Sequence, residues 1–271
     1  MTDGDCTEFL KWALPRMGMR WEGFRKPRGQ VCKRIRERLG DLELRSFERY
    51  RDYLDDHPEE WEELTFRCRV TISRFFRERS VWRDLGRRIG DLWEEKDGTD
   101  PLAVWSSGCA SGEEPWSLRI LWDLQIACDL PEEASLEILA TDFDPHLLDR
   151  ARRACYPQSS LEEVPERWRE TAFERREDEH CLQGRFRHGV EWRRHDLRRE
   201  APPGLFDLVF CRYVVYIYSD EAAQEKLTRR LAGSIRPGGL LVVGAKEEIP
   251  EPCEDLFEPF DPSIYRRAVL D

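Results

Sequence analysis

Beyond a loop at residues 97–101, short apolar runs of strand type alternate with longer stretches of helical periodicity. This alternation constrains the fold more than any other feature of the chain. The predicted strands span residues 103–107, 136–141, 205–211 and 240–244, and the predicted helices span residues 115–128, 145–154 and 220–235. Because strands separated by helices are joined by crossover connections, the pattern predicts an α/β fold, a mostly parallel sheet with helices on both faces.

The first 95 residues show a different pattern, without a convincing strand. Apolar positions such as Val31, Ile35 and Leu39 recur at helical spacing. Gly40 is typical of the end of one helix and Pro58 of the start of another. We therefore expect a helical N-terminal domain with a linker helix over residues 1–95 and an α/β domain over residues 96–271.

Residues 157–195 interrupt the strand–helix alternation of the second domain. This stretch is highly charged and contains short alternating runs at residues 181–186 and 190–192. Alternation of apolar and polar residues favours half-buried strands. We interpret the stretch as a small inserted β-subdomain beside the main sheet.

The composition excludes two broad classes of protein. Ten Trp and 13 Phe are too many for a disordered chain, and 37% charged residues are too many for a membrane protein. The sequence has no apolar run of about 18 residues, the length that a membrane-spanning helix needs. Residues 1–14 lack the pattern of a secretory signal. We expect a soluble, cytoplasmic protein without membrane insertion.

Nine cysteines are scattered singly along the chain. Their odd number and the lack of a CxxC pair fit neither a zinc site nor a disulfide framework, so we expect a reducing compartment and mostly buried thiols. The five histidines show no HxxxH spacing, which argues against a metal site.

Positive charge is concentrated near the N-terminus of a chain whose net charge is −11. Between Lys11 and Arg51, 13 Lys and Arg stand against 5 Asp and Glu, a local net charge of +8. The segment forms either solvated helix faces or a docking surface for an acidic partner, in which Arg34, Arg38 and Arg45 would take part. Basic and aromatic residues are not interleaved, which argues against nucleic acid as the partner.

The loop after the first predicted strand reads Gly108-Cys109-Ala110-Ser111-Gly112-Glu113-Glu114-Pro115. Its small residues let a ligand approach the backbone closely, but it does not match the G-x-G-x-x-G dinucleotide fingerprint. Glu113 and Glu114 stand at the helix start, where a phosphate would need positive potential. They favour a cationic ligand, or they only complement the helix dipole.

Two further acids follow predicted strands. Asp142 ends the strand at residues 136–141, where an acid can accept hydrogen bonds from a ribose diol. Asp196 follows a strand-like run, and its carboxylate can accept from an adenine amino group. Together with the loop, they predict a nucleoside pocket without phosphates, and S-adenosylmethionine is a cofactor of that description.

Five segments then resemble one family in the order of the chain, the chemotaxis-receptor glutamate methyltransferases (CheR-type). They are Thr71-Ile72-Ser73-Arg74-Phe75-Phe76-Arg77-Glu78, the segment from Val104 to Ser117, Ala140-Thr141-Asp142-Phe143-Asp144, Phe206-Asp207-Leu208-Val209-Phe210-Cys211-Arg212, and Arg236-Pro237-Gly238-Gly239. The resemblance extends from about Arg45 to Arg266. Tyr213 stands where the family has an asparagine after Cys-Arg.

The resemblance implies a class I methyltransferase domain, a Rossmann-like fold with a seven-stranded, mostly parallel sheet, and it implies the helical N-terminal domain and inserted β-subdomain already expected. It also implies the cofactor S-adenosylmethionine and the product S-adenosylhomocysteine. The residues that it assigns to the cofactor are Thr71, Ser73, Arg77, Gly108, Ala110, Glu113, Glu114, Asp142, Asp196, Leu197, Arg212 and Tyr213.

Within that set, the resemblance places Glu113 or Glu114 at the methionine amino group, and Asp142 at the ribose. It places Asp196 with Leu197 at the adenine. Arg77 and Tyr218 carry the catalytic assignment, because both fall near the transferred methyl group in the family.

The expected reaction is methyl transfer to the glutamate carboxylates of a protein. The resemblance implies that this protein is an acidic, helical receptor of the chemotaxis type. A carboxylate with a pKa of about 4.3 is already ionised at neutral pH, so the reaction needs alignment rather than a general base. A guanidinium such as that of Arg77 suits the alignment of a carboxylate. The alternatives are methylation of another protein or of a small carboxylic acid, and an inactive cofactor-binding regulatory module.

Overall fold

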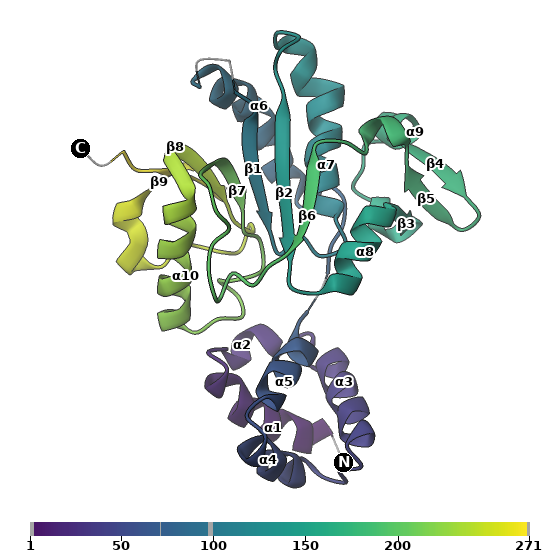
Figure 1. Cartoon of the computed structure of the whole chain (residues 1–271), viewed down its shortest axis with the longest axis vertical. Helices are drawn as coiled ribbons and strands as arrows, with labels where there is room; N and C mark the ends of the chain where they lie inside the picture. Colours follow the sequence, from purple (N-terminus) through teal and green to yellow (C-terminus); the bar gives the residue numbers. More distant parts are fainter. Residues whose placement is uncertain (1–2, 71, 97–99, 270–271) are drawn as a thin grey trace. The chain divides into compact units, whose positions relative to one another are not determined.

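The computed structural model describes residues 3–70, 72–96 and 100–269, and its contacts divide the chain into two units (Figure 1). One unit comprises Met1–Thr71 and Val215–Gln224, and the other comprises Ile72–Val214 and Glu225–Asp271. This division lies one helix before the predicted boundary near residue 95. The reason is that the last N-terminal helix, α6 (Arg79–Glu94), packs into the core of the second unit.

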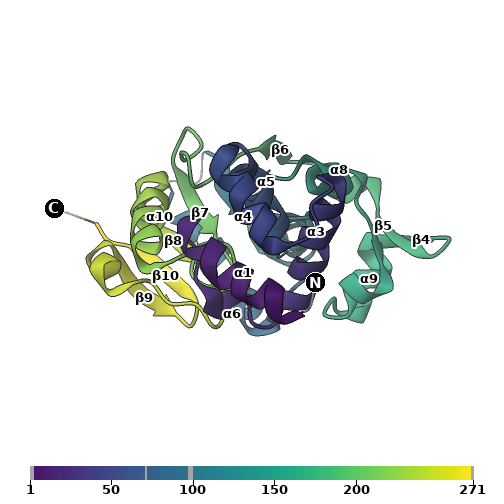
Figure 2. The same ribbon diagram turned by 90° about the horizontal axis from the view of Figure 1, so that it is seen from below.

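The first unit is helical, as the spacing of its apolar residues predicted, and its helices are grouped closely together (Figure 2). The helices are α1 (Asp3–Arg16), α2 (Trp21–Phe24), α3 (Arg28–Asp41), α4 (Phe47–Asp56) and α5 (Glu60–Cys68). Val31, Ile35 and Leu39 are buried on one face of α3. Ser46 caps α4 by accepting a hydrogen bond from the backbone amide of Arg49 at 3.2 Å.

A buried ion pair lies inside this unit. The Arg38 guanidinium donates to both carboxylate oxygens of Glu60 at 2.9 and 2.7 Å, and the Tyr50 hydroxyl donates to Glu60 at 2.8 Å. Arg34 donates to the backbone carbonyls of Arg67 and Arg69. Arg34 and Arg38 are thus committed to internal contacts, which corrects the expectation that these two residues face an acidic partner.

A distant segment completes the first unit. Residues 215–224 pair with the chain that follows α1, through a bridge between Met19 and Ser219. The Arg20 amide donates to the Tyr218 carbonyl at 2.9 Å, and the Arg20 side chain donates to the Ile217 carbonyl at 3.0 Å. The chain therefore leaves the first unit and returns to it after about 140 residues of sequence.

The second unit is built on a seven-stranded sheet with the order β6-β2-β1-β7-β8-β10-β9 (Figure 1). Its strands are β1 (Leu102–Ser107), β2 (Leu136–Asp142), β6 (Val190–Arg194), β7 (Phe206–Phe210), β8 (Ile235–Val242), β9 (Phe257–Asp261) and β10 (Ile264–Arg267). The pairs among β6, β2, β1, β7 and β8 are parallel, whereas β10 is antiparallel to both of its neighbours. The expected mostly parallel sheet is confirmed.

The last predicted parallel strand is longer than the sequence indicated. β8 begins at Ile235 and continues past Pro237, Gly238 and Gly239, which were expected to form a turn before the strand. Phe206 of β7 pairs with Ile235 of β8, but Leu208 pairs with Leu240. Pro237, Gly238 and Gly239 therefore form an irregularity within β8. Proline has no amide hydrogen and is tolerated at such a position.

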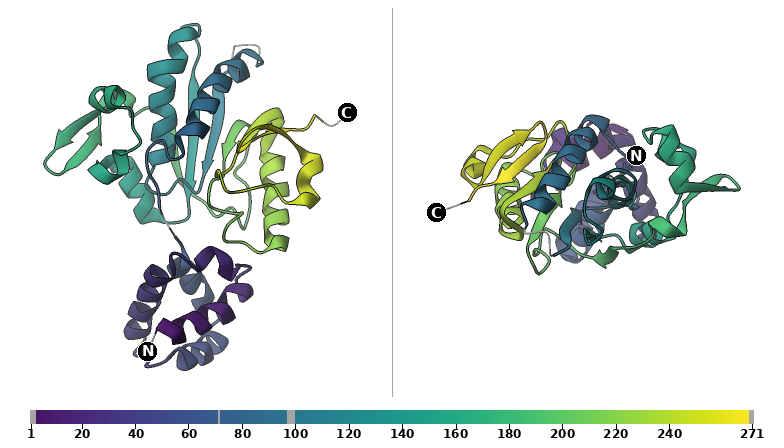
Figure 3. Two further views of the ribbon diagram at one scale, coloured as in Figure 1. Left: turned by 180° about the vertical axis from the view of Figure 1, so that it is seen from behind. Right: turned by 90° about the horizontal axis from the view of Figure 1, so that it is seen from above.

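Helices lie on both faces of the sheet. α6 and α7 (Glu113–Leu121) lie side by side against one face, and α10 (Glu221–Ser234), from Glu225 onward, lies on the opposite face (Figure 3). α7 continues into a π-helical turn, Trp122–Ile126, and a 3-10 turn, Ala127–Asp129. α8 (Pro145–Arg153) follows β2, as predicted.

The inserted subdomain is a separate three-stranded antiparallel sheet with the order β3-β5-β4. It comprises β3 (Cys155–Pro157), β4 (Phe173–Arg176) and β5 (Glu179–Leu182), with α9 (Glu166–Ala172) and the 3-10 turns Gln158–Leu161 and Gly184–Phe186. The assignment of residues 190–192 to the insertion was wrong. Val190–Arg194 is β6, which pairs with β2 along the edge of the large sheet.

The expectation of no disulfide framework was also wrong for four cysteines. Cys6 of α1 is bonded to Cys32 of α3, and Cys155 is bonded to Cys181 directly opposite it on β5. Each pair is 26 residues apart, a spacing that carries no motif, so only the packing brings the sulfurs together. Four of the five cysteines outside these disulfides are buried, as predicted: Cys68, Cys109, Cys211 and Cys253. In the described residues, none of the helices has the length and apolar character needed to span a bilayer.

Candidate functional site

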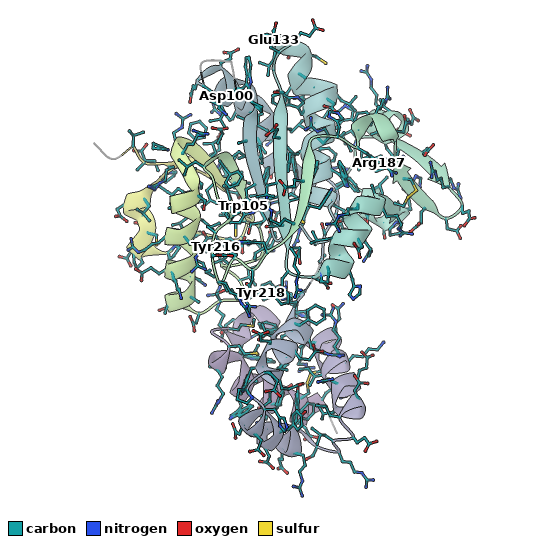
Figure 4. The ribbon with its side chains drawn as sticks, viewed as in Figure 1. Asp100, Trp105, Glu133, Arg187, Tyr216 and Tyr218 are labelled. Atoms are coloured by element: carbon teal, nitrogen blue, oxygen red, sulfur yellow. A yellow bond between two sulfur atoms is a disulfide. The ribbon has the colours of Figure 1, made fainter. Side chains whose placement is uncertain are left out.

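The loop between β1 and α7 lies at the carboxyl edge of the parallel strands, where α/β folds bind ligands. Figure 4 labels Asp100 and Glu133, which precede β1 and β2 and lie at the other end of the sheet. In the loop, Gly108 and Gly112 have positive φ values of 70° and 91°. A Cβ on Gly108 would lie 2.4 Å from a methyl group of Val214, and one on Gly112 would lie 2.7 Å from the Ala151 methyl group. Both positions therefore require glycine.

Asp142, at the end of β2, holds this loop in place. One carboxylate oxygen accepts from the Ala110 amide at 2.9 Å, and the other accepts from the Asp144 amide at 2.9 Å. Ala110 itself has a left-handed φ of 49°, so the hydrogen bond stabilises a strained residue. A carboxylate has about four acceptor sites. Asp142 can therefore hold the loop and still accept hydrogen bonds from a ligand.

Glu113 is almost fully buried in the first turn of α7, with 2% of its surface exposed. The Ser111 hydroxyl donates to its carboxylate at 2.9 Å. Burial raises the pKa of Glu113, and its own backbone amide and the hydroxyls of Ser73 and Ser111 oppose the rise only in part. A buried carboxylate held mainly by hydroxyls is suited to a cationic ligand group, which would compensate its charge.

Glu114 is half-buried and contacts a cation. It accepts from the Ser106 hydroxyl at 2.8 Å and from the Arg212 guanidinium at 3.3 Å. Burial raises the pKa of Glu114, and the positive charge of Arg212 lowers it in opposition. Glu113 and Glu114 were grouped together by the sequence, but the structure gives them different partners.

Arg212 joins three segments of the site. Beyond Glu114, it donates to the Glu78 carboxylate at 2.8 Å and to the Arg77 carbonyl at 2.7 Å. Glu78 also accepts from the Tyr213 hydroxyl and from the Ala245 amide at 3.0 Å. Burial alone would raise the pKa of Glu78, but the hydrogen bonds from Tyr213 and Arg212 outweigh it and hold the pKa below its usual value. Arg212 thus has a clear structural role in fixing the turn that carries Arg77.

Tyr213 occupies a backbone conformation that suits the family's asparagine and is unusual for a tyrosine. Its φ is 58°, in the left-handed region where asparagine is enriched and bulky residues are outliers. Its amide donates to Glu247 at 2.7 Å and its hydroxyl to Glu78, which holds the strained residue at both ends. Burial and the hydrogen bond to Glu78 raise the pKa of the Tyr213 hydroxyl, so the hydroxyl stays protonated.

Arg77 lies on this network. Its guanidinium stacks over the Tyr213 ring, with Cζ 3.9 Å from the ring centroid, and donates to the Ile72 carbonyl at 2.8 Å. The side chain is half-buried. A guanidinium has five donors in a planar fork, so Arg77 keeps donors for a ligand carboxylate.

Asp196 and Leu197 follow β6, the neighbour of β2. The His195 amide donates to the Asp142 carbonyl at 3.0 Å, which brings Asp196 to the same edge of the sheet. The Asp196 carboxylate accepts from the side chain of Arg198 at 3.0 and 2.8 Å, and Leu197 is buried. Both predicted adenine contacts are therefore near Asp142, with Asp196 already paired to an arginine.

The structure does not place two predicted site residues relative to this group. Tyr218 belongs to the first unit, where its ring packs against Phe24 with centroids 5.3 Å apart. Thr71 lies outside the described residues. The assignments of Thr71 and Tyr218 remain predictions from the resemblance.

Sequence reasoning missed Glu78 and Glu247 as members of the site. Glu247 is 5% exposed and accepts from the amides of Tyr213 and Gly244 at 2.7 and 2.9 Å. Its other carboxylate oxygen is buried without a partner in the described structure, and burial raises its pKa. Glu247 follows the end of β8, so the rule that identified Asp142, an acid after a parallel strand, would have found it too.

The donor set fits the cofactor that the resemblance implies. Two buried carboxylates, Glu113 and Asp142, lie at the carboxyl edge, and the hydrogen-bond donors that lower the pKa of Glu113 are hydroxyls and a backbone amide. That set suits a ligand with a cationic end and a ribose, and the acidic loop does not suit phosphates. Among the described residues, no cluster of His, Cys, Asp and Glu has the arrangement of a metal site.

Comparison with known proteins gives the same result. The family model described as "CheR methyltransferase, SAM binding domain" matches residues 71–265. The chain is 34% identical to the chemotaxis protein methyltransferase of Listeria monocytogenes, over 68% of each protein. It is 33% identical to chemotaxis protein methyltransferase 2 of Pseudomonas aeruginosa, over 80% of this chain and 77% of that protein. It is 28% identical to chemotaxis protein methyltransferase 2 of Vibrio cholerae, over 92% and 87%.

Proposed function

The chain belongs to the CheR methyltransferase family, and from that premise we propose that it methylates glutamate side chains of a chemotaxis receptor. It is an enzyme, a methyltransferase, and S-adenosylmethionine is its cofactor. The observation that carries the glutamate assignment is the Arg77 guanidinium, stacked on Tyr213 beside the predicted cofactor residues.

The residues of the site divide the work of binding and alignment. When bound, the cofactor supplies a methyl group on a positively charged sulfur. In our proposal, Glu113 accepts hydrogen bonds from the amino group of the cofactor, and Asp142 accepts hydrogen bonds from its ribose hydroxyls. Asp196 and Leu197 contact its adenine. These contacts fix the position of the cofactor relative to Arg77.

Arg77 then orients the substrate carboxylate, which is ionised at neutral pH and needs no base to remove a proton. The planar fork of a guanidinium holds a carboxylate in a defined direction, and alignment of reacting groups contributes on the order of 7–11 kcal/mol in well-oriented systems. The Arg212–Glu78 pair supports Arg77 by fixing its carbonyl, so Arg212 acts through Arg77. The carried-over assignment of Tyr218 to the methyl-transfer step is tested by Tyr218→Phe.

The acidic substrate would be attracted by the first unit. With Arg34 and Arg38 engaged internally, the exposed cations of the segment are the ones suited to this role, among them Lys26, Lys33 and Arg45. Complementary charge raises association rates more than it raises affinity in the bound state.

The test is methyl transfer from methyl-labelled S-adenosylmethionine to the cytoplasmic fragment of a chemotaxis receptor. A glutamate methyl ester releases its label as methanol in mild alkali, whereas a methylated nitrogen does not. A receptor fragment whose surface glutamates are replaced by glutamine should accept no label. Alkali-stable label would contradict a carboxylate acceptor.

The same assay separates the alternatives. Labelling of other proteins or of small carboxylic acids, with receptor fragments left unlabelled, would favour a relative with a different substrate. Cofactor binding without turnover on any carboxylate would favour a regulatory module.

A further inference from the structure

A cavity of about 570 Å³ lies in the second unit between α6, the π-helical turn after α7 and the segment that enters α9. Three rings line it, those of Phe76, Trp82 and Trp168. The Phe76 ring centroid is 5.4 Å from that of Trp82 and 5.4 Å from that of Trp168. Phe76 and Trp82 are buried, and Trp168 is half-buried, so its ring is accessible from the cavity. The volume lies within the usual range of small-molecule sites, about 300–1,000 Å³.

Four arginines surround these rings: Arg79, Arg83, Arg87 and Arg167. The first three recur at every fourth residue of α6, on the side opposite its buried stripe of Val81, Leu85 and Ile89. Like charges four residues apart on a helix repel each other, so the row of arginines costs stability unless something neutralises it.

The carboxylates nearby neutralise only part of this charge. Arg79 donates to the backbone carbonyls of Glu163 and Glu162 at 3.2 and 3.1 Å, and Arg83 contacts Asp84 at 3.4 Å on the surface. Among the described residues, no carboxylate lies within 4.0 Å of the Arg87 or Arg167 guanidinium. Glu163 is the one acid among the residues that line the cavity. In a chain of net charge −11, this is a local concentration of positive charge.

We propose that this cavity binds a nucleotide. A planar base would stack on the accessible Trp168 ring, since every base has a π face that suits an aromatic platform. The phosphates would meet Arg87 and Arg167, whose planar forks match phosphate oxygens. Glu163 and the exposed Gln125 amide, both on the lining, offer an acceptor and a donor for the edge of the base. A nucleotide joins a flat ring to a multiply charged anion, so one molecule can stack on the aromatic rings and pair with the arginines. An acidic peptide can do both only if it also carries an aromatic residue.

The cavity shares one turn of backbone with the predicted cofactor site. Phe76 and Glu78 both have left-handed φ values, of 51° and 64°, so the turn is strained. Phe76 and Arg79 line the cavity, whereas Arg77 and Glu78 belong to the network around Arg212. The Trp82 indole, which lines the cavity, donates to the Arg77 carbonyl at 3.0 Å. A bound nucleotide would therefore change the stability of the turn that carries Arg77.

Nucleotide binding itself does not depend on the proposed function; only its coupling to the cofactor rests on the assignment of Arg77. The experiment is calorimetric titration of GTP and of ATP into the full chain saturated with S-adenosylhomocysteine, so that neither nucleotide is bound at the cofactor site. Pyrophosphate serves as a probe without a ring. We expect at least one nucleotide to bind more tightly than pyrophosphate.

Matched variants locate the site. Arg87→Glu with Arg167→Glu should weaken nucleotide binding at least about tenfold, because two charge-assisted contacts are lost. Trp168→Leu should weaken nucleotide binding and leave pyrophosphate binding unchanged. Arg175→Glu, an exposed arginine on β4 that does not line the cavity, should change the affinity by less than about twofold.

Several results would overturn the proposal. They are failure of both nucleotides to bind, equal affinity for pyrophosphate and nucleotide, unchanged binding in the double arginine variant, and binding of a glutamate-rich peptide containing tryptophan in place of nucleotides. Coupling is measured separately as the affinity for S-adenosylhomocysteine with and without nucleotide, which must change by the same factor in both directions. An unchanged cofactor affinity would overturn the coupling and leave the methyl-transfer proposal untouched.

Discussion

Replacing Asp142 with alanine should weaken cofactor binding by a predictable amount. In our proposal, the carboxylate accepts hydrogen bonds from the ribose, and hydrogen bonds to charged groups contribute about 1.5–3 kcal/mol. At 1.4 kcal/mol for each factor of ten, the Kd for S-adenosylhomocysteine should rise about 10- to 150-fold. The same substitution leaves the amides of Ala110 and Asp144 without their acceptor, so the loop after β1 should also lose order and the variant should be less stable.

Asp144→Ala is the matched control for Asp142→Ala. Asp144 is two residues away and caps α8, with its carboxylate accepting from the His146 amide at 2.9 Å. Loss of such a cap costs about 0.5–2 kcal/mol of stability, while cofactor affinity should stay within about twofold of wild type. Calorimetry gives the affinities, and thermal unfolding shows that both variants are folded. If Asp142→Ala, properly folded, bound the cofactor as wild type does, the assignment of Asp142 to the ribose would be refuted.

Three further predictions follow from the geometry. Arg77→Lys should lower kcat at least about tenfold, since lysine lacks the planar fork; wild-type kcat would make Arg77 a structural residue only. Glu60→Gln should lower the free energy of unfolding by about 3 kcal/mol because it breaks a buried ion pair. Burial would raise the pKa of Glu60, but hydrogen bonds from Arg38 and Tyr50 outweigh it and hold the pKa below 4.5. In denaturant titrations, the difference in unfolding free energy between wild type and variant should therefore persist above pH 4.5 and shrink below it. A difference that does not depend on pH would contradict the ion pair. Replacing Lys26, Lys33 and Arg45 together by glutamate should lower kcat/KM for the receptor fragment and remove its salt dependence. Salt shortens the screening length from about 10 Å at 0.1 M to about 3 Å at 1 M, and an unaltered salt profile would exclude steering by these residues.

Much of the second unit could be predicted because its information is local. Strands β1 and β2 and helix α8 are read from runs of apolar residues and from the residues that end them, and Asp142 follows from its place after a strand. Tyr213 shows the limit of such reading. The sequence shows that tyrosine stands where the family has asparagine, which marks the position as unusual. Only the structure shows that the residue must adopt a left-handed backbone conformation, with a φ of 58°.

The features that sequence reasoning missed depend on residues far apart in the chain. Glu78 pairs with Arg212, which is 134 residues away in the chain. The sequence around Glu78 therefore does not indicate this ion pair. The disulfide partners and the internal role of Arg38 are likewise set by packing of separate helices or strands. β6 was misassigned because a short, charged run at the edge of a sheet has half of its surface in water and resembles a subdomain strand.

The return of residues 215–224 to the first unit limits how this protein can be rearranged by recombination. A breakpoint after residue 71 would separate Arg20 from the carbonyls of Tyr216 and Ile217, to which it donates. The catalytic portion would then carry residues 215–224 without the helices that they pack with, and the helical portion would lack part of its own structure. Exchange of the N-terminal unit between relatives therefore requires a second, matching replacement far downstream, so the two units should be inherited together rather than shuffled as independent modules.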